Sequence, residues 1–127
     1  MRTFNYENVK NPEYFCDGRA EAHSDHAYYA SEADRETGCS LFQESLNGIW
    51  KFHYAKNYDA VVPGFEKDEY CCASWDDIRV PAHIQMEGYD APQYANTQYP
   101  WEGREDIRPG EIPEHFNPVA SYVKYFR

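Results

Sequence analysis

The sequence predicts an all-β fold of the sandwich type, in which short strands are separated by frequent turns. Aromatic residues make up 17% of the 127 residues, and aromatic side chains favour strands. Five prolines lie between residues 92 and 118, where they exclude long helices and deep central strands because each removes a backbone donor and fixes φ. A chain of this length can bury the core of one domain and has no room for a second.

Three segments carry the strand signals. Residues 49–54 alternate, with Trp50, Phe52 and Tyr54 on one side, which is typical of a half-buried strand that follows a turn at Asn47-Gly48. Residues 77–80 form a second short strand that Pro81 ends. Residues 121–126 are rich in aromatic and β-branched side chains and predict a third. Residues 86–117 are expected to be mostly extended loop.

The first third of the chain has a different character. Residues 1–40 are polar, lack sustained periodicity and contain turn pairs such as Asp17-Gly18. We expect an irregular N-terminal arm over residues 1–40 and a folded domain over residues 41–127. Within the arm, residues 27–33 could form one helical turn, with Ser31 or Asp34 as its cap.

Charge and cysteine content exclude several classes of protein. The formal charge of -10 disfavours nucleic acid and anionic membranes, since both are bound through cationic side chains. The four cysteines show no Cys-x-x-Cys spacing, and the adjacent pair Cys71-Cys72 cannot easily bridge to itself. No signal peptide and no apolar segment long enough for a membrane span is evident. We therefore expect a reduced, cytoplasmic protein that contacts neither nucleic acid nor membrane.

One cluster near the N-terminus contains residue types that bind metal ions. Glu21, His23, Asp25 and His26 bring imidazole and carboxylate groups close together in the sequence. No further ligands follow at a typical zinc spacing, so a solvated loop is the preferred interpretation, and we expect no metal ligands in the chain.

Four segments together carry a family resemblance. In order along the chain they are residues 45–52 (SLNGIWKF), 80–100 (VPAHIQMEGYDAPQYANTQYP), 100–103 (PWEG) and 117–126 (NPVASYVKYF). The combination of a Gly-Tyr-Asp-x-Pro turn with a Tyr-x-Asn-x-x-Tyr-Pro segment is the most specific part. The chain resembles the front of a family 2 glycoside hydrolase, the family of the large bacterial β-galactosidases.

The resemblance implies a more specific fold and function. It implies a partial jelly-roll β-sandwich, galactose-binding-domain-like, that belongs to an enzyme hydrolysing terminal β-D-galactosides with retention. It also implies that both catalytic carboxylates come from a later TIM-barrel domain, so that this chain has no catalytic residue and is inactive alone. Mg and Na ions are expected to serve the full-length parent through ligands outside this chain, which itself needs no cofactor.

The resemblance assigns Asn96 to the galactose subsite of the parent. An amide can both donate to and accept from a sugar hydroxyl, although an asparagine that bonds its own loop is the structural alternative. Tyr94, Tyr99 and Trp101 could stack on a sugar face or, more simply, pack the loop that carries Asn96. All four residues are candidate substrate-binding positions.

Two other functions fit the same residues. A free-standing carbohydrate-binding module would need a complete sugar platform within the chain. A complementing fragment would act by joining another polypeptide, namely the rest of the parent enzyme. Because a strand is expected next to Arg127, its partner strands are expected to be missing, and unpaired edges favour a homo-oligomer.

Overall fold

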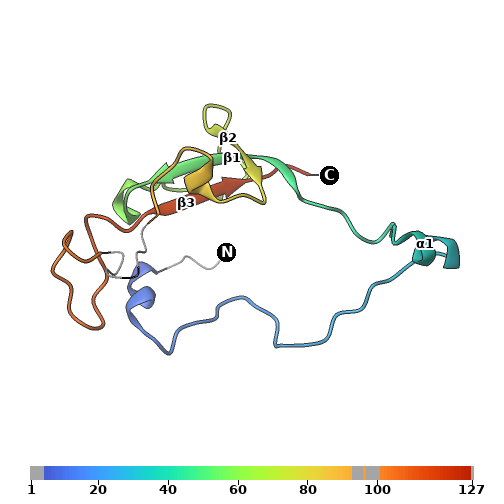
Figure 1. The fold of residues 1–127 in the computed structure, drawn as a ribbon, viewed down its shortest axis with the longest axis horizontal. Coiled ribbons are helices and arrows are strands. Elements are labelled where there is room, and N and C mark those ends of the chain that lie inside the picture. Colours follow the sequence, from blue (N-terminus) through green and yellow to red (C-terminus); the bar gives the residue numbers. More distant parts are fainter. Residues whose placement is uncertain (1–4, 93–95, 97–100, 127) are drawn as a thin grey trace.

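The computed structural model describes residues 5–92, 96 and 101–126. Its centre is an antiparallel sheet of three strands in the order β2-β1-β3 (Figure 1). The strands are β1 (Gly48–Ala55), β2 (Asp76–Val80) and β3 (Val119–Val123). Each of the three expected strands is present, and the prediction of an all-β fold is confirmed.

The two edge strands pair with different halves of β1. Strand β2 runs from Gly48↔Val80 to Phe52↔Asp76, and β3 runs from Lys51↔Val123 to Ala55↔Val119. The third strand therefore lies earlier than the expected residues 121–126. Beyond Val123 the ladder is replaced by a side-chain contact, in which Lys124 Nζ donates to the carbonyl of Ile49 at 2.9 Å.

Aromatic rings cover one face of the sheet. Phe52, which is 0% exposed, lies between Tyr122 of β3, at a centroid distance of 4.9 Å, and Tyr89, at 4.6 Å. Trp50 contacts Tyr122 edge-on at 6.4 Å. This is the face that the alternation of residues 50, 52 and 54 predicts.

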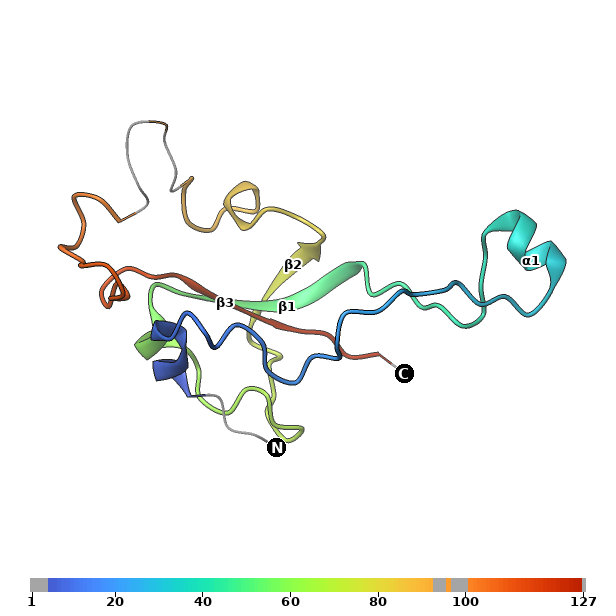
Figure 2. The same cartoon turned by 90° about the horizontal axis from the view of Figure 1, so that it is seen from below.

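The opposite face is only partly covered, as expected of a half-buried first strand: Ile49 is exposed, whereas Lys51 and His53 are half-buried. His53 lies 5.2 Å from the ring of Trp75, and Phe65 and Tyr70 surround the same indole. Cys72, like Trp75, is buried. The chain between β1 and β2 thus folds under the sheet, while the chain after β2 lies on the other side (Figure 2).

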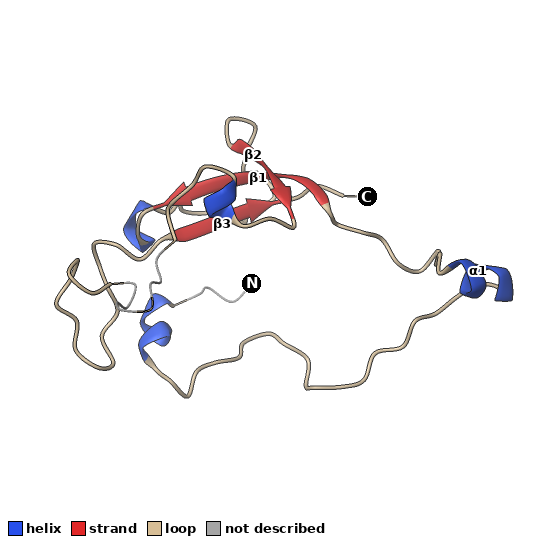
Figure 3. Cartoon of the chain, viewed as in Figure 1, coloured by secondary structure: helices blue, strands red, loops and turns tan. Residues whose placement is uncertain are grey.

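The arm extends far from the sheet and returns to it (Figures 1 and 3). It contains a 3-10 helix η1 (Tyr6–Lys10) and a helix α1 (Glu32–Thr37), neither with a buried residue. The hydroxyl of Ser31 accepts from the backbone N–H of Asp34 at 3.1 Å, so the expected cap is present. The helix nevertheless follows Ser31 and does not span residues 27–33, because a cap precedes the helix that it stabilises.

Two further 3-10 turns complete the elements: η2 (Tyr58–Ala60) after β1 and η3 (Ile84–Met86) after β2. In the part of the chain that the structure describes, no helix has the length and apolar character that crossing a membrane requires.

Candidate functional site

Asn96 belongs to a long loop that leaves the sheet after β2 and returns at β3 (Figure 2). We call residues 84–90 its front stem and residues 101–105 its rear stem. The front stem contains η3 and then two positive φ angles, 95° at Gly88 and 58° at Asp90. Glycine adopts such angles freely and aspartate tolerates them, so the local sequence permits the sharp turn that precedes the loop.

The front stem is attached to the first face of the sheet through Tyr89. Its hydroxyl donates to Asp76 Oδ2 at 2.8 Å, and its ring packs on Phe52. Burial, the bond to Asp76 and the charges of Asp76 and Glu87 raise the pKa of Tyr89 to about 12. Arg79 of β2 adds an ion pair with Glu87 at 3.0 Å.

Asp90 also contacts the sheet. Burial, followed by the charge of Asp90 and a hydrogen bond to it, raises the pKa of Tyr54 in β1. The Asp90 carboxylate is thus bonded to a tyrosine hydroxyl, which is a structural role.

The rear stem begins with a tight turn at Trp101. The Trp101 carbonyl accepts from the N–H of Arg104 at 2.9 Å and from that of Glu105 at 3.3 Å. This turn directs the Glu105 carboxylate toward a later part of the loop. There Oε2 accepts from the N–H of Glu114 at 2.8 Å, and Oε1 accepts from those of His115 and Phe116.

Three backbone donors stabilise the ionised form of Glu105. Desolvation raises the pKa of the carboxyl, but the hydrogen bonds from residues 114–116 and the nearby His115 lower it by more. The net result is a pKa below the ordinary value, as expected when several N–H groups stabilise the anion. The Arg104 guanidinium lies 4.2 Å from the ring centroid of Phe116 and adds a cation–π contact between the same two segments.

Residues 114–117 are in turn fixed to the end of β1. Asn57 Nδ2 donates to the carbonyl of Glu114 at 2.9 Å, and the N–H of Asn117 donates to the carbonyl of Lys56 at 3.0 Å. The rear stem is therefore connected to the sheet through two successive sets of hydrogen bonds.

The structure places two of the four candidate substrate-binding residues. Asn96 is exposed in a turn, and Trp101 is half-buried at the start of the rear stem. Tyr94 and Tyr99 lie outside the described residues. Sequence reasoning missed Glu105 altogether, because its contacts reach 9 to 11 residues along the chain and no periodic pattern indicates them.

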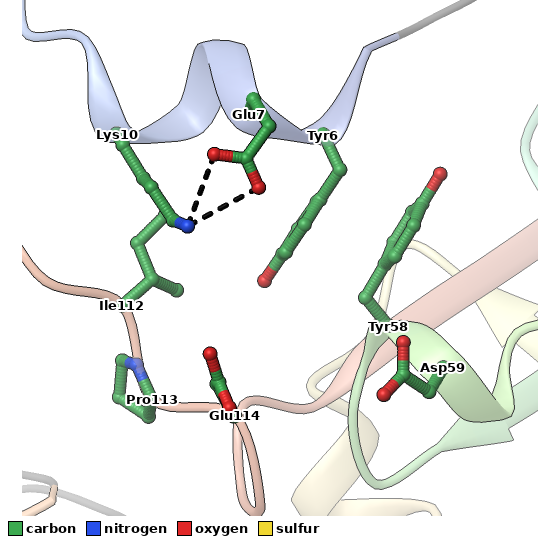
Figure 4. A pocket seen from close by; sticks show the side chains of 8 residues that line it. All are labelled: Tyr6, Glu7, Lys10, Tyr58, Asp59, Ile112, Pro113 and Glu114. Atoms are coloured by element: carbon green, nitrogen blue, oxygen red, sulfur yellow. Dashed lines mark hydrogen bonds and ion pairs between the residues drawn. The ribbon is translucent and has the colours of Figure 1, made fainter.

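A small pocket lies where the arm meets the loop (Figure 4). Its volume is about 230 Å³, and the rings of Tyr6 and Tyr58 stack there at a centroid distance of 4.0 Å. Lys10 pairs with Glu7 at 3.0 Å, and the hydrogen bond to Glu7 raises the pKa of Lys10. Asn117 Nδ2 also donates to the Tyr6 hydroxyl at 3.4 Å. The contacts of Tyr6 with Tyr58 and Asn117 attach η1 to the segments next to the sheet.

The part of the chain that the structure describes contains no cluster that fits a metal ion. Among the described residues no three His, Cys, Asp or Glu side chains gather in a way that could hold an ion. In the cluster noted in the sequence, His23 Nδ1 contacts the carbonyl of Glu21 and its Nε2 lies 3.0 Å from Asp25 Oδ1, all exposed. These groups satisfy one another at the surface.

Comparison with known families identifies the class of protein. The family described as "Glycosyl hydrolases family 2, sugar binding domain" matches residues 43–127. Since this match covers more than half of the chain, the chain belongs to that family. The resemblance inferred from the motifs is confirmed, and the open antiparallel sheet fits the jelly-roll-like β fold that it implies.

The individual relatives are β-galactosidases. The chain is 51% identical over 120 residues to the β-galactosidase of Halalkalibacterium halodurans and 42% identical over 118 residues to that of Streptococcus thermophilus. Each match covers 93% of this chain but 12% of the relative. A β-galactosidase large subunit from Latilactobacillus sakei is 37% identical over 96% of the chain and 21% of its own length. The chain thus spans about an eighth of the first two relatives.

Proposed function

We propose that the chain is the sugar-binding-domain part of a β-galactosidase that hydrolyses terminal non-reducing β-D-galactosides with retention. Its contribution is the loop between β2 and β3, which presents Asn96 to the substrate in the active site of the parent. The similarity to β-galactosidases supports the activity. The observation that carries the role of the loop is that Asn96 is exposed between a front stem bonded to β2 and a rear stem bonded to residues 114–116, which are in turn bonded to the end of β1.

The chemistry of the loop suits a sugar. The Asn96 amide can donate to one hydroxyl and accept from another. Trp101 offers a flat apolar surface against which a sugar ring or the loop itself can pack. In this proposal Tyr94 and Tyr99 flank Asn96 in the same two roles.

The reaction itself is assigned to the rest of the parent. Retaining hydrolysis uses two carboxyl groups about 5 to 5.5 Å apart, one of which protonates the leaving oxygen while the other attacks the anomeric carbon. We place both on a later barrel domain, where active sites lie at the ends of strands. The Mg and Na ions expected for the parent are placed there as well, and the chain alone is inactive.

The proposed partners are the rest of the parent enzyme and further copies of it. Phe15 in the arm is 84% exposed and Leu41, directly after the arm, is 85% exposed, and apolar side chains in such positions are suited to contact with other protein. Strands β2 and β3 are the edges of the described sheet and could accept additional strands. We propose a cytoplasmic location because the four cysteines are all free, and disulfides are rare in the reducing cytoplasm.

The assignment of catalysis to the remainder can be tested with the chain alone. Purified chain is expected to give no turnover of a nitrophenyl β-galactoside above that of buffer, whereas the full-length parent turns it over. Turnover by the chain that Asn96→Ala abolishes would overturn the proposal. Calorimetric titration with galactose or lactose is a second test, because sub-millimolar affinity of the chain would indicate a free-standing carbohydrate-binding module.

A further inference from the structure

We propose that Glu105 is a positioning residue for substrate binding: its carboxylate holds the rear stem against residues 114–116 and thereby sets where Asn96 meets the sugar. This inference rests on the function proposed above. It assigns no contact between Glu105 and the substrate.

The Glu105 carboxylate forms three hydrogen bonds with residues 114–116, and we call this set of bonds the clamp. One carboxylate accepts from three consecutive backbone N–H groups, at 2.8 Å from Glu114 and 3.0 Å from Phe116, with His115 between them. Hydrogen bonds that involve an ionised group are stronger than neutral ones. Three such bonds from one side chain fix both its position and that of the chain segment that donates to it.

The clamp joins two parts of the loop that are distant in the sequence. Residues 101–117 contain no helix or strand. Among the described residues, their backbone–backbone hydrogen bonds are those of the turns at Trp101 and Arg108 and one from Asn117 to Lys56, at the end of β1. Glu105 connects the turn at Trp101 to residues that are themselves fixed to the end of β1.

The position of the clamp relates it to the candidate substrate-binding residues. Trp101 begins the turn that orients Glu105, and Asn96 stands five residues earlier in the sequence. A change in the rear stem therefore displaces the end of the segment that carries the amide. Because a hydrogen bond weakens steeply with poor distance and angle, even a small displacement loosens the contact with a sugar hydroxyl.

The charge of Glu105 suggests the substitution to use. Glutamine keeps the size of the side chain and one acceptor oxygen, but its amide nitrogen is a donor. Whichever way this amide is turned, at least one backbone N–H of residues 114–116 faces a second donor. Glu105→Gln thus disrupts the clamp without leaving a cavity.

The test is a double-mutant cycle in the full-length parent enzyme, with a nitrophenyl β-galactoside as substrate. Asn96→Ala, Glu105→Gln and the double variant are compared with the wild type by KM and kcat. We expect Glu105→Gln to raise KM about fivefold, the change that corresponds to one net hydrogen bond, and to leave kcat nearly unchanged. In the Asn96→Ala background the same substitution should have almost no effect on KM, since the amide that it displaces is gone.

A matched control is available in the same loop. Glu111 Oε2 accepts from the N–H of Arg108 at 2.8 Å, three residues away, so Glu111→Gln makes the same chemical change within a local turn. We expect it to leave KM within twofold of the wild-type value. If Glu105→Gln does not yield folded enzyme, Glu105→Asp replaces it in the double-mutant cycle, because aspartate keeps the charge and shortens the reach of the carboxylate.

The outcomes separate the inference from the function on which it rests. If Asn96→Ala raises KM while Glu105→Gln does not, or if their effects on KM simply add, the clamp does not position the amide and the inference fails alone. If Asn96→Ala leaves KM and kcat unchanged, the proposed role of the loop fails and the inference fails with it.

Discussion

The sheet and the loop between β2 and β3 are held in place by different kinds of contact. Around Phe52, aromatic rings from three separate segments pack on one another and exclude water. In the rear stem, the half-buried Glu105 carboxylate instead accepts hydrogen bonds from three backbone N–H groups. Apolar burial tolerates little loss of volume, whereas hydrogen bonds fix direction. We infer that the sheet supplies the stability of the chain and the loop supplies the orientation of its sugar-contact residues.

The largest effect is expected from removing the central ring of the sheet. Phe52→Ala should lower the free energy of unfolding by about 3 to 5 kcal/mol, because it removes a fully buried side chain and leaves a cavity. Urea unfolding of the chain, followed by circular dichroism, measures it. The control is Ile49→Ala on the same strand, where the side chain is 57% exposed and the expected loss is at most about 1 kcal/mol. Equal losses at the two positions would refute the assignment of the core to the aromatic face.

A smaller effect is expected at Tyr89, where sheet and loop meet. Its pKa is raised to about 12 in the folded chain and is about 10 in an unfolded one. The unfolded state therefore releases its proton first, and the free energy of unfolding contributed by Tyr89 falls as the pH rises from about 10 to about 12. Urea unfolding across this window should show a shallower decline for Tyr89→Phe than for the wild type. An identical decline would contradict the buried, Asp76-bonded hydroxyl.

The sequence predicts the sheet better than it predicts the loop. Alternation at residues 50, 52 and 54 indicates β1 and its aromatic face, and Pro81 indicates the end of β2. The cover on the second face could not be foreseen, because Trp75 reaches His53 from more than 20 residues away and no local period records that contact. The contacts on this second face are a property of the folded chain.

The candidate site likewise contains one residue that the sequence indicates and one that only the folded chain indicates. Asn96 stands out in the sequence only through the Tyr-x-Asn-x-x-Tyr-Pro segment, and its role stays a prediction. Glu105 is one acidic residue among 22 and belongs to no recognised motif. It becomes prominent when the fold brings the N–H groups of residues 114–116 to its carboxylate.

The central claim is that the Asn96 amide bonds a hydroxyl of the sugar, and the most direct measurement pairs Asn96→Ala with monodeoxy β-galactosides in the full-length parent. With the intact galactoside, Asn96→Ala should lower kcat/KM by about 5- to 100-fold, the range for a hydroxyl left without its partner. With the one monodeoxy substrate that lacks this hydroxyl, wild type and variant should have the same kcat/KM. The same loss on every monodeoxy galactoside, or no loss on the intact one, would contradict the claim.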